Sequence, residues 1–302
     1  MADRPPLLAI VNPEAGGGRC GRAAGQVLER LRARGLAVDE THTHAPGEAV
    51  EIASRAFEAG RRHFVAVGGD GTAHEVVNGI FRHPTAPEAG VHLGFLPLGT
   101  GNSFLRDFSD EGAPYAERCL AEGRTRPCDV LACEHEGGTL YFINLLSTGF
   151  VAKVNDLRQF RLRRLGEFGY VAAVVAQVAG LAAERMPILL DGELRIDDDL
   201  AFCSFNNSKF TGGKMMMAPS ADPADGFIEV VVVRALPRRR LLAAFPRIFR
   251  GTHVELPEVS VHRAREVVFE MPRRQALMVD GEAVRLSPRR LGVLPGALTI
   301  YA

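Results

Sequence analysis

A run of apolar residues that ends in glycines and an acid is the part of the sequence best suited to chemistry. The apolar residues 64–67 are followed by Gly68, Gly69, Asp70, Gly71 and Thr72. This order predicts a buried strand, a tight turn and a helix start, because glycine permits positive φ and lets the backbone approach a ligand closely. Free amides at the amino end of the helix attract anions. The turn is therefore a candidate phosphate site.

The acid in this turn indicates a cation as well. A carboxylate among phosphate-binding amides is unfavourable unless a cation accompanies the phosphate, and Mg²⁺ prefers oxygen ligands of this kind. Asp70 therefore predicts Mg²⁺, bound directly or through water. The competing interpretation is an ordinary strand-to-helix turn in which Asp70 caps the helix.

Two further glycine turns favour the phosphate site. Residues 12–18 follow a predicted strand at 7–11, and residues 97–103 follow another at 93–96 and are expected to open a helix. A strand at 36–40 and helices at 26–34, 48–59 and 72–81 complete the pattern. Alternating strands and helices predict an open parallel sheet, whose carboxyl edge would bring the three turns together. A polyanionic nucleotide is the expected ligand.

The first turn also permits a different class of protein. Gly16, Gly18 and Gly21 spell G-x-G-x-x-G, and Asp39 and Glu40 lie roughly where a dinucleotide fold places its ribose-binding acid. This alternative is an NAD-binding oxidoreductase. It is weakened because the glycines begin well past the strand and because the turn at 68–71 is the stronger signal.

Composition describes an ordinary globular chain. Its 302 residues favour two domains, and 46% apolar with 24% charged residues is typical of a soluble protein. Lys+Arg and Asp+Glu are both 36, so no overall field favours nucleic acid. The 5 cysteines form no C-x-x-C pair, which favours a reducing compartment over a disulfide framework or a zinc site. Without a signal-peptide pattern or an apolar run of ~18 residues, a cytoplasmic protein is expected.

The second half of the chain has a different pattern. Strand-like runs lie at 128–134, 140–146, 188–190, 200–206, 227–233, 267–270 and 276–279. Few helices separate them, which predicts a second, largely antiparallel domain with the architecture of a β-sandwich. We therefore divide the chain into an α/β domain at 1–127 and a β-sandwich domain at 128–302, with the extreme C-terminus able to pack back on the first domain.

Several motifs in order resemble the diacylglycerol kinase catalytic-domain family, which groups bacterial diacylglycerol and phosphatidylglycerol kinases with sphingosine and ceramide kinases. They are N-P-x-x-G-G at 12–17, G-G-D-G-T at 68–72, P-L-G-T-G-N at 97–102, G-G-K-M at 212–215, A-P at 218–219, D-G-F at 225–227 and D-G-E at 280–282. The resemblance runs the whole length of the chain. It implies a nucleotide-binding α/β domain, a C-terminal β-sandwich and an active site in the cleft between them.

The resemblance also implies roles for individual residues. Those expected to hold ATP are Asn12, Gly16, Gly17, Thr43, Gly68, Gly69, Asp70, Gly71, Thr72, Ala73, His74, Glu75, Gly99, Thr100 and Asn102. Asp70 would serve the metal-bound triphosphate, and Asp280 and Glu282 would be the catalytic carboxylates, with Glu282 as general base. A structural Mg²⁺ is implied at Asp225 and the carbonyls of Asp222 and Phe227, with Asp129 linked to it. The implied reaction is ATP- and Mg²⁺-dependent transfer of the γ-phosphoryl group to a lipid hydroxyl.

Departures from the family pattern leave alternatives open. Ala224-Asp225 replaces a pair of acids, so one carboxylate is missing at the structural metal site. Gly101-Asn102-Ser103 replaces the A-N-D of bacterial diacylglycerol kinases and is similar to sphingosine kinases in its G-N pair. The acceptor is thus diacylglycerol or a related lipid such as phosphatidylglycerol, with a sphingoid base or ceramide as the alternative. For D-G-E the competing interpretation is a hairpin turn, and for the whole chain it is a nucleotide-regulated lipid-binding module without activity.

Two stretches that mix basic and apolar residues suggest how the chain reaches a lipid. Arginines at 158–164 precede the apolar residues 168–183, and arginines at 238–240, 247 and 250 surround apolar residues. Such helices dock on anionic membranes, although both could simply cover the sandwich. The expected location is the cytoplasm with peripheral membrane association. A homodimer is compatible with the sequence but not specified by it.

Overall fold

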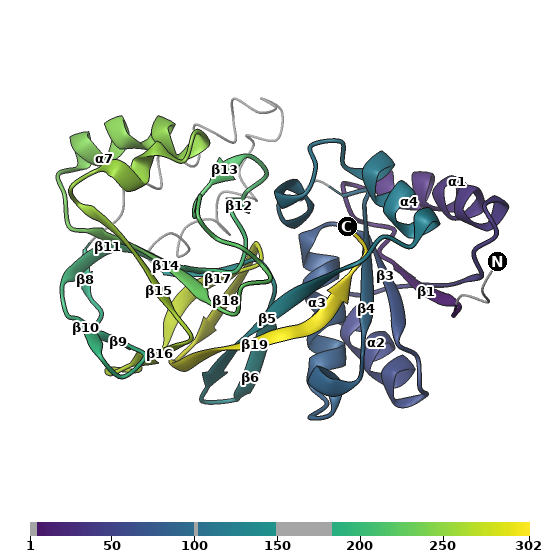
Figure 1. Ribbon diagram of the computed structural model, residues 1–302, viewed down its shortest axis with the longest axis horizontal. Helices are drawn as coiled ribbons and strands as arrows, with labels where there is room; N and C mark the ends of the chain where they lie inside the picture. The colour runs from purple at the N-terminus through teal and green to yellow at the C-terminus, as the bar shows by residue number, and fades with distance from the viewer. Residues whose placement is uncertain (1–4, 100–101, 149–182) are drawn as a thin grey trace.

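The computed structural model describes residues 5–99, 102–148 and 183–302, which form two lobes (Figure 1). Predictions for Thr100, Gly101 and the basic stretch at 157–182 lie outside the described residues.

The first lobe is built on a parallel sheet. Its strands β1 (Leu7–Val11), β2 (Val38–His42), β3 (His63–Gly68) and β4 (His92–Pro97) lie in the order β4-β3-β1-β2. All three pairings are parallel, as predicted. β3 is buried from Phe64 onward because helices cover both faces of the sheet.

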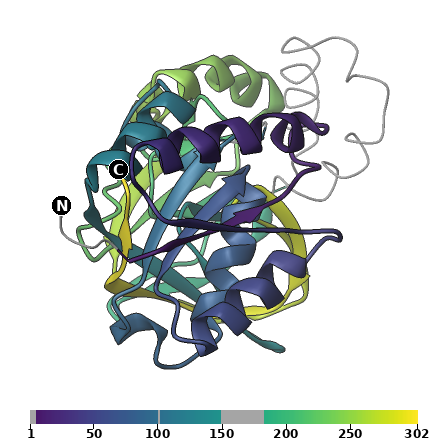
Figure 2. The same ribbon diagram turned by 90° about the vertical axis from the view of Figure 1, so that its right-hand side faces the viewer.

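Two pairs of helices supply that cover. α1 (Arg19–Ala33) and α4 (Ala113–Glu122) lie on one face of the sheet, and α2 (Glu48–Glu58) and α3 (Asp70–Phe81) lie on the other (Figure 2). α1 begins earlier than predicted, at residue 19 instead of 26, and α3 begins at residue 70 instead of 72. The glycine turns are consequently shorter, and their last residues belong to helices.

The turn after β4 does not open an α-helix, contrary to prediction. A single 3₁₀ segment, η2 (Phe104–Asp107), follows it, and α4 starts only after Gly112. The reason is packing: the Phe104 ring lies 5.1 Å from the Phe95 ring and is buried, so the chain folds down on β4. A short 3₁₀ helix, η1 (Ala86–Glu88), precedes β4.

The second lobe is mostly antiparallel, as predicted. Its strands are β5 (Arg126–His135), β6 (Gly138–Phe142), β7 (Leu145–Thr148), β8 (Glu184–Arg185), β9 (Ile188–Leu190), β10 (Leu194–Ile196), β11 (Asp199–Asn206), β12 (Phe210–Thr211), β13 (Met215–Met216), β14 (Ile228–Arg234), β15 (Val259–Ala264), β16 (Glu266–Phe269), β17 (Gln275–Val279), β18 (Glu282–Leu286) and β19 (Pro288–Ile300). Among the described residues, one sheet has seven strands, with the path β15-β14-β11-β7-β17-β18 and β8 beside β11. The lobe's own core contains Leu131, Phe142, Phe205 and Phe269.

β19 ties the two lobes together. It pairs antiparallel with β5 and then parallel with β4 at Thr299 and Ile300. The parallel strands of the first lobe therefore belong to a sheet that has ten strands among the described residues and passes through both lobes, with the C-terminus in the first (Figure 1). The predicted division at residue 127 falls inside β5, a strand of this shared sheet.

One segment lies outside these cores. α7 (Arg238–Ala244) and η4 (Phe245–Phe249) contain no fully buried residue, and η5 (Thr252–Glu255) follows them. None of the helices within the described ranges combines the length and apolar character needed to cross a membrane.

Candidate functional site

The three glycine turns meet at the carboxyl edge of the parallel sheet. The Gly99 amide donates to the Gly68 carbonyl at 2.7 Å. A Cβ on Gly99 would lie 2.9 Å from the Gly69 backbone, and one on Gly16 would lie 3.2 Å from the Leu98 carbonyl oxygen. Only glycine permits these close approaches. The structure therefore brings residues 16, 68–69 and 98–99 into one contiguous surface.

Asp70 lies at the start of α3, and its carboxylate is buried. Both oxygens accept the Ser103 amide, at 3.2 and 3.1 Å, and Gly69 is the N-cap, without a side-chain cap. The helix-cap interpretation of Asp70 is therefore wrong. Burial raises the pKa of Asp70 to about 6, the charge of Asp280 adds to this, and hydrogen bonds from the Ser103 backbone and side chain oppose it.

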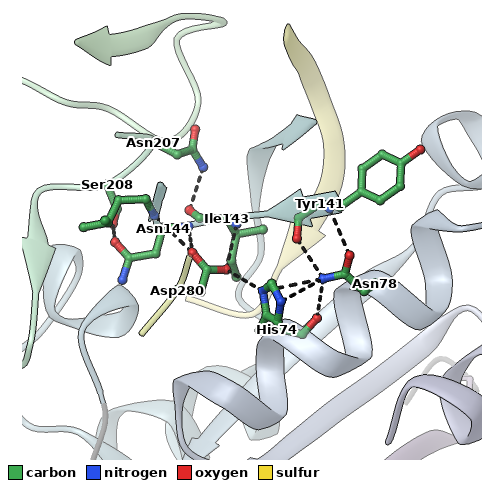
Figure 3. A network of polar contacts seen from close by, with 9 residues as sticks. His74, Asn78, Tyr141, Ile143, Asn144, Asn207, Ser208 and Asp280 are labelled. Carbon is green, nitrogen blue, oxygen red and sulfur yellow. Dashed lines mark hydrogen bonds and ion pairs between the residues drawn. The ribbon is translucent and has the colours of Figure 1, made fainter. Parts of the chain in front are cut away.

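Asp280 occupies the turn of the β17–β18 hairpin. φ is 48° at Asp280 and 88° at Gly281, and Val279 pairs with Glu282, so the hairpin interpretation of D-G-E is confirmed. The Asp280 side chain nevertheless points inward. Its carboxylate accepts the amides of Ile143, Asn144 and Leu145 at 3.2, 3.0 and 3.0 Å (Figure 3). The residues 280–282 therefore form a hairpin turn that is also part of the candidate site.

A polar network connects this hairpin to α3. His74 Nδ1 lies 3.5 Å from Asp280 Oδ2. Asn78 Nδ2 donates to the Tyr141 carbonyl at 2.8 Å, and its Oδ1 accepts the Tyr141 amide at 2.9 Å (Figure 3). Asn78 therefore pins α3 to β6. Our sequence reasoning missed it, although residues 70, 74 and 78 follow the helical i, i+4 spacing and form a polar stripe on a largely buried helix.

Glu282 reaches across from the second lobe to the first. The residue is exposed, and a Cβ built on Gly71 would lie 2.6 Å from its Oε1. A cavity of about 20 Å³ is lined by Gly69, Asp70, Asn102, Asn144 and Asp280, among others. Asp70 and Asp280 therefore line one cavity, and Glu282 contacts the turn that carries Asp70 at its next residue, Gly71.

The remaining residues expected at ATP occupy different positions around the turns. Asn12 Oδ1 accepts the Glu14 amide at 3.1 Å, and the Thr43 amide donates to Val11 at 2.9 Å. Thr72 is buried against Gly68. A Cβ on Gly68 would lie 2.3 Å from the Thr72 hydroxyl oxygen. Ala73 is also buried.

Glu75, which is expected at the nucleotide, contacts the amino end of α2. Its carboxylate accepts the amides of Gly47 and Ala49 at 3.1 and 3.2 Å. These amides belong to the amino end of α2, where a negative charge is favourable. The structure therefore gives Glu75 a helix-capping contact at the start of α2.

Two contacts that sequence reasoning missed fasten the second lobe to the turn at 97–107. The Gly213 amide donates to the Ser103 hydroxyl at 3.0 Å, and the Lys209 amide donates to the Asp107 carboxylate at 3.1 and 3.0 Å. Burial raises the pKa of Asp107 to about 6. Ser103 thus lies between the candidate metal carboxylate, Asp70, and the loop that carries the exposed Lys214.

The residues expected to hold a structural Mg²⁺ do not fit that ion. Asp225 Oδ2 is paired with the Arg263 guanidinium, and its Oδ1 accepts the Phe227 amide at 2.9 Å. Asp222 Oδ1 accepts the Ala224 amide, and Asp129 accepts two other amides. Among the described residues, no three His, Cys, Asp or Glu side chains are grouped to hold a metal. A cation here would have to displace an arginine.

A glycine-lined edge of a parallel sheet thus faces the acids Asp280 and Glu282 of the second lobe, as expected for a two-domain kinase. Residues 6–133 match the diacylglycerol kinase catalytic domain, and residues 144–302 match the YegS C-terminal NAD kinase beta sandwich-like domain. The chain belongs to the diacylglycerol kinase family of lipid kinases, and it is a transferase.

Relatives and solved structures agree with this membership. A diacylglycerol kinase of Mycobacterium tuberculosis is 30% identical, over 97% of this chain and 94% of the relative. One of Bacillus subtilis is 28% identical, over 95% and 90%. The crystal structure of a diacylglycerol kinase from Bacillus anthracis superposes with a TM-score of 0.75 at 20% identity, covering 100% of this chain and 98% of that one, which supports the fold.

This membership sets aside two of the alternatives. The oxidoreductase suggested by Gly16, Gly18 and Gly21 is not supported, and Gly21 lies inside α1, where a Cβ would meet the Pro13 carbonyl oxygen at 3.2 Å. Gly21 is therefore explained by packing of α1 on its preceding turn. A binding module without activity is likewise replaced by a kinase.

Proposed function

We propose that this protein is an ATP- and Mg²⁺-dependent lipid kinase that transfers the γ-phosphoryl group to a hydroxyl of diacylglycerol or a related lipid such as phosphatidylglycerol. The observation that carries the proposal is the position of Glu282, whose carboxylate lies over Gly71 where the three glycine turns meet. A proton acceptor thus lies next to the surface proposed to hold the phosphates.

The glycine turns and Asp70 supply the nucleotide side of this site. Gly16, Gly17 and Gly18 have φ of 66°, 68° and 79°, and consecutive amides in such turns form a concavity suited to anions. Asp70 faces the cavity together with Asn102. One carboxylate plus substrate phosphates is a usual set of Mg²⁺ ligands, so Asp70 fits this role. The bound ion would neutralise charge on the triphosphate.

Glu282 and Asp280 have different proposed roles toward the lipid hydroxyl. A lipid hydroxyl must lose its proton as it bonds to phosphorus, and an exposed carboxylate such as that of Glu282 can accept that proton. Asp280, held by three backbone amides, fixes the hairpin that carries Glu282. We therefore assign the general base to Glu282 and the positioning of the hairpin to Asp280.

The segment of α7 and η4 is the proposed contact with an anionic membrane. Arg238, Arg239, Arg247 and Arg250 lie there beside Phe249, which is 41% exposed. Arg240 is paired with Glu258, whereas these four have no acidic partner within the described part of the chain. Each arginine near an anionic leaflet adds about 1 kcal/mol of attraction. Sedimentation with vesicles of neutral lipid and of anionic lipid tests this, and equal binding to both would contradict it.

A sphingoid base or ceramide is the second candidate acceptor. The Gly101-Asn102 pair is the feature that favours it, since this G-N pair is similar to that of sphingosine kinases and stands where bacterial diacylglycerol kinases commonly carry A-N-D. A panel of diacylglycerol, phosphatidylglycerol, sphingosine and ceramide separates the candidates by which one acquires phosphate.

The decisive experiment is incubation with labelled ATP, Mg²⁺ and this lipid panel, followed by separation of the products. We expect transfer to at least one lipid and a loss of about 100-fold or more in Glu282→Gln, since general-base catalysis contributes about 10²–10⁴-fold. Glu88→Gln is the matched control, because Glu88 is exposed on η1, before β4. If folded Glu282→Gln retained nearly full turnover, the assignment of the base would be wrong.

A further inference from the structure

The loop of residues 222–227 is where the resemblance implies a structural Mg²⁺, yet protein groups already satisfy its acids. Asp225 has one oxygen on the Phe227 amide at 2.9 Å and the other on Arg263. Its side chain is 25% exposed and that of Arg263 is 52% exposed. Ala224 leaves Asp225 without a neighbouring acid, and the carboxylate of Asp225 is neutralised by a guanidinium.

The strand pairing of the seven-stranded sheet places Arg263 at this loop. β14 begins at Ile228, directly after the loop, and β15 pairs with it so that Glu229 lies opposite Arg263. The Arg263 guanidinium also lies 4.4 Å from the centre of the Phe227 ring, and that of Arg265 lies 4.9 Å from it. Stacking on an aromatic face suits the planar guanidinium and limits the positions it can take. Arg263 is thus held by the register, the ring and the carboxylate together.

Asp129 anchors the same loop without an ion. Its side chain is buried, and its carboxylate accepts the Gly226 amide and the Gly296 amide, both at 2.7 Å. Its own amide donates to the Pro223 carbonyl at 2.6 Å. These contacts join the loop to β5 and β19. Both acids that the resemblance links to the metal are therefore bound to protein donors.

We infer that in this chain the Arg263 guanidinium takes the place of the structural divalent cation, so that the loop of residues 222–227 keeps its structure without Mg²⁺. A guanidinium carries one positive charge and several donors, which match one carboxylate, whereas a divalent cation suits a set of several oxygen ligands. The absence of a second acid beside Asp225 thus agrees with its pairing to Arg263.

Thermal unfolding of the full chain without nucleotide or lipid tests this inference separately from the proposed reaction. We expect the same melting temperature in excess EDTA and in millimolar Mg²⁺ or Ca²⁺. In EDTA, Arg263→Gln should melt roughly 1–2 °C lower, as expected for losing one partly exposed ion pair in a chain of 302 residues. Arg265→Gln is the matched control, because Arg265 contacts the same ring without pairing with Asp225, and it should shift the melting temperature less.

Two results would overturn the inference. One is a saturable stabilisation of the unmodified chain by Mg²⁺ or Ca²⁺ that persists in Asp70→Asn, where the candidate nucleotide site is altered, and disappears in Asp225→Asn. The other is a melting temperature of Arg263→Gln no lower than that of Arg265→Gln. The double variant Arg263→Gln/Asp225→Asn should show less than the summed loss of the two single variants, since the second substitution removes an acid that has already lost its partner.

Discussion

Asp70 and Asp225 are both acids in glycine-containing loops that the sequence assigns to Mg²⁺, and the structure treats them differently. The Asp70 carboxylate is buried beside a cavity and meets only neutral donors, so its pKa is raised to about 6. The Asp225 carboxylate is partly exposed and meets a guanidinium. We infer from the comparison that Asp70, whose charge has no cationic partner among the described residues, is the better candidate for a cation. The charge of Asp225 is already balanced by the guanidinium of Arg263.

The largest effect that separates the two acids should be on turnover. We expect Asp70→Asn to lower kcat/KM by about 1000-fold or more, because the amide removes the charge proposed to hold the metal-bound triphosphate. Asp225→Asn should remain within about 3-fold, since it lies outside the reacting groups. Labelled ATP and the best acceptor of the lipid panel give both values. Similar losses in two folded variants would contradict the distinction.

Asp280 extends the comparison to an acid that is buried and fully hydrogen-bonded. Asp280→Ala would leave the amides of Ile143, Asn144 and Leu145 without their acceptor, and it should lower the free energy of unfolding by about 2–4 kcal/mol. Urea unfolding followed by circular dichroism measures this loss. Thr139, exposed on β6, offers a control in Thr139→Ala. A variant of unchanged stability would contradict this prediction, because it would show that the three amides bind another acceptor, such as water.

The effect of removing the charge on stability should distinguish Asp70 from Asp225 by sign. A carboxyl whose folded pKa is raised binds protons more tightly when folded, so it destabilises the fold above that pKa, and the cost is relieved as pH falls from about 6 toward 3.8. Asp70→Asn should therefore raise the free energy of unfolding by roughly 1–3 kcal/mol at pH 7 to 8 without nucleotide. Asp225→Asn should lower it by about 1 kcal/mol or less.

Urea unfolding at pH 8 and pH 5 checks this prediction. The advantage of Asp70→Asn over the unmodified chain should shrink at pH 5, where Asp70 is protonated in the folded chain. Loss of activity together with a gain in stability is the expected signature of an acid kept for function. An Asp70→Asn variant that is less stable at pH 8 would contradict the proposed cost of its charge.

Sequence reasoning recovered what depends on local pattern. The run at 64–67 is followed directly by glycines, and the run at 7–11 is followed by glycines at 16–18. Each apolar strand could therefore be read together with its turn, so the parallel sheet and the meeting of its turns were predictable. β19 was missed because Pro288, Pro295 and Gly296 interrupt its apolar pattern, and its pairing with β5 shifts register twice. The partner of Asp225 was missed for a different reason. Arg263 is 38 residues away, and only the register of β14 with β15 brings it there.

The smallest effect we predict concerns Ser103, which joins the two lobes beside Asp70. Its hydroxyl accepts the Gly213 amide at 3.0 Å, and its side chain hydrogen-bonds Asp70. Ser103→Ala should lower kcat about 5–10-fold, equivalent to about 1 kcal/mol or slightly more, because one neutral hydrogen bond contributes that much. Ser103→Thr keeps the hydroxyl and should recover most of the rate. If Ala and Thr were equally impaired, the buried volume at this position, and not its hydroxyl, would be what the site requires.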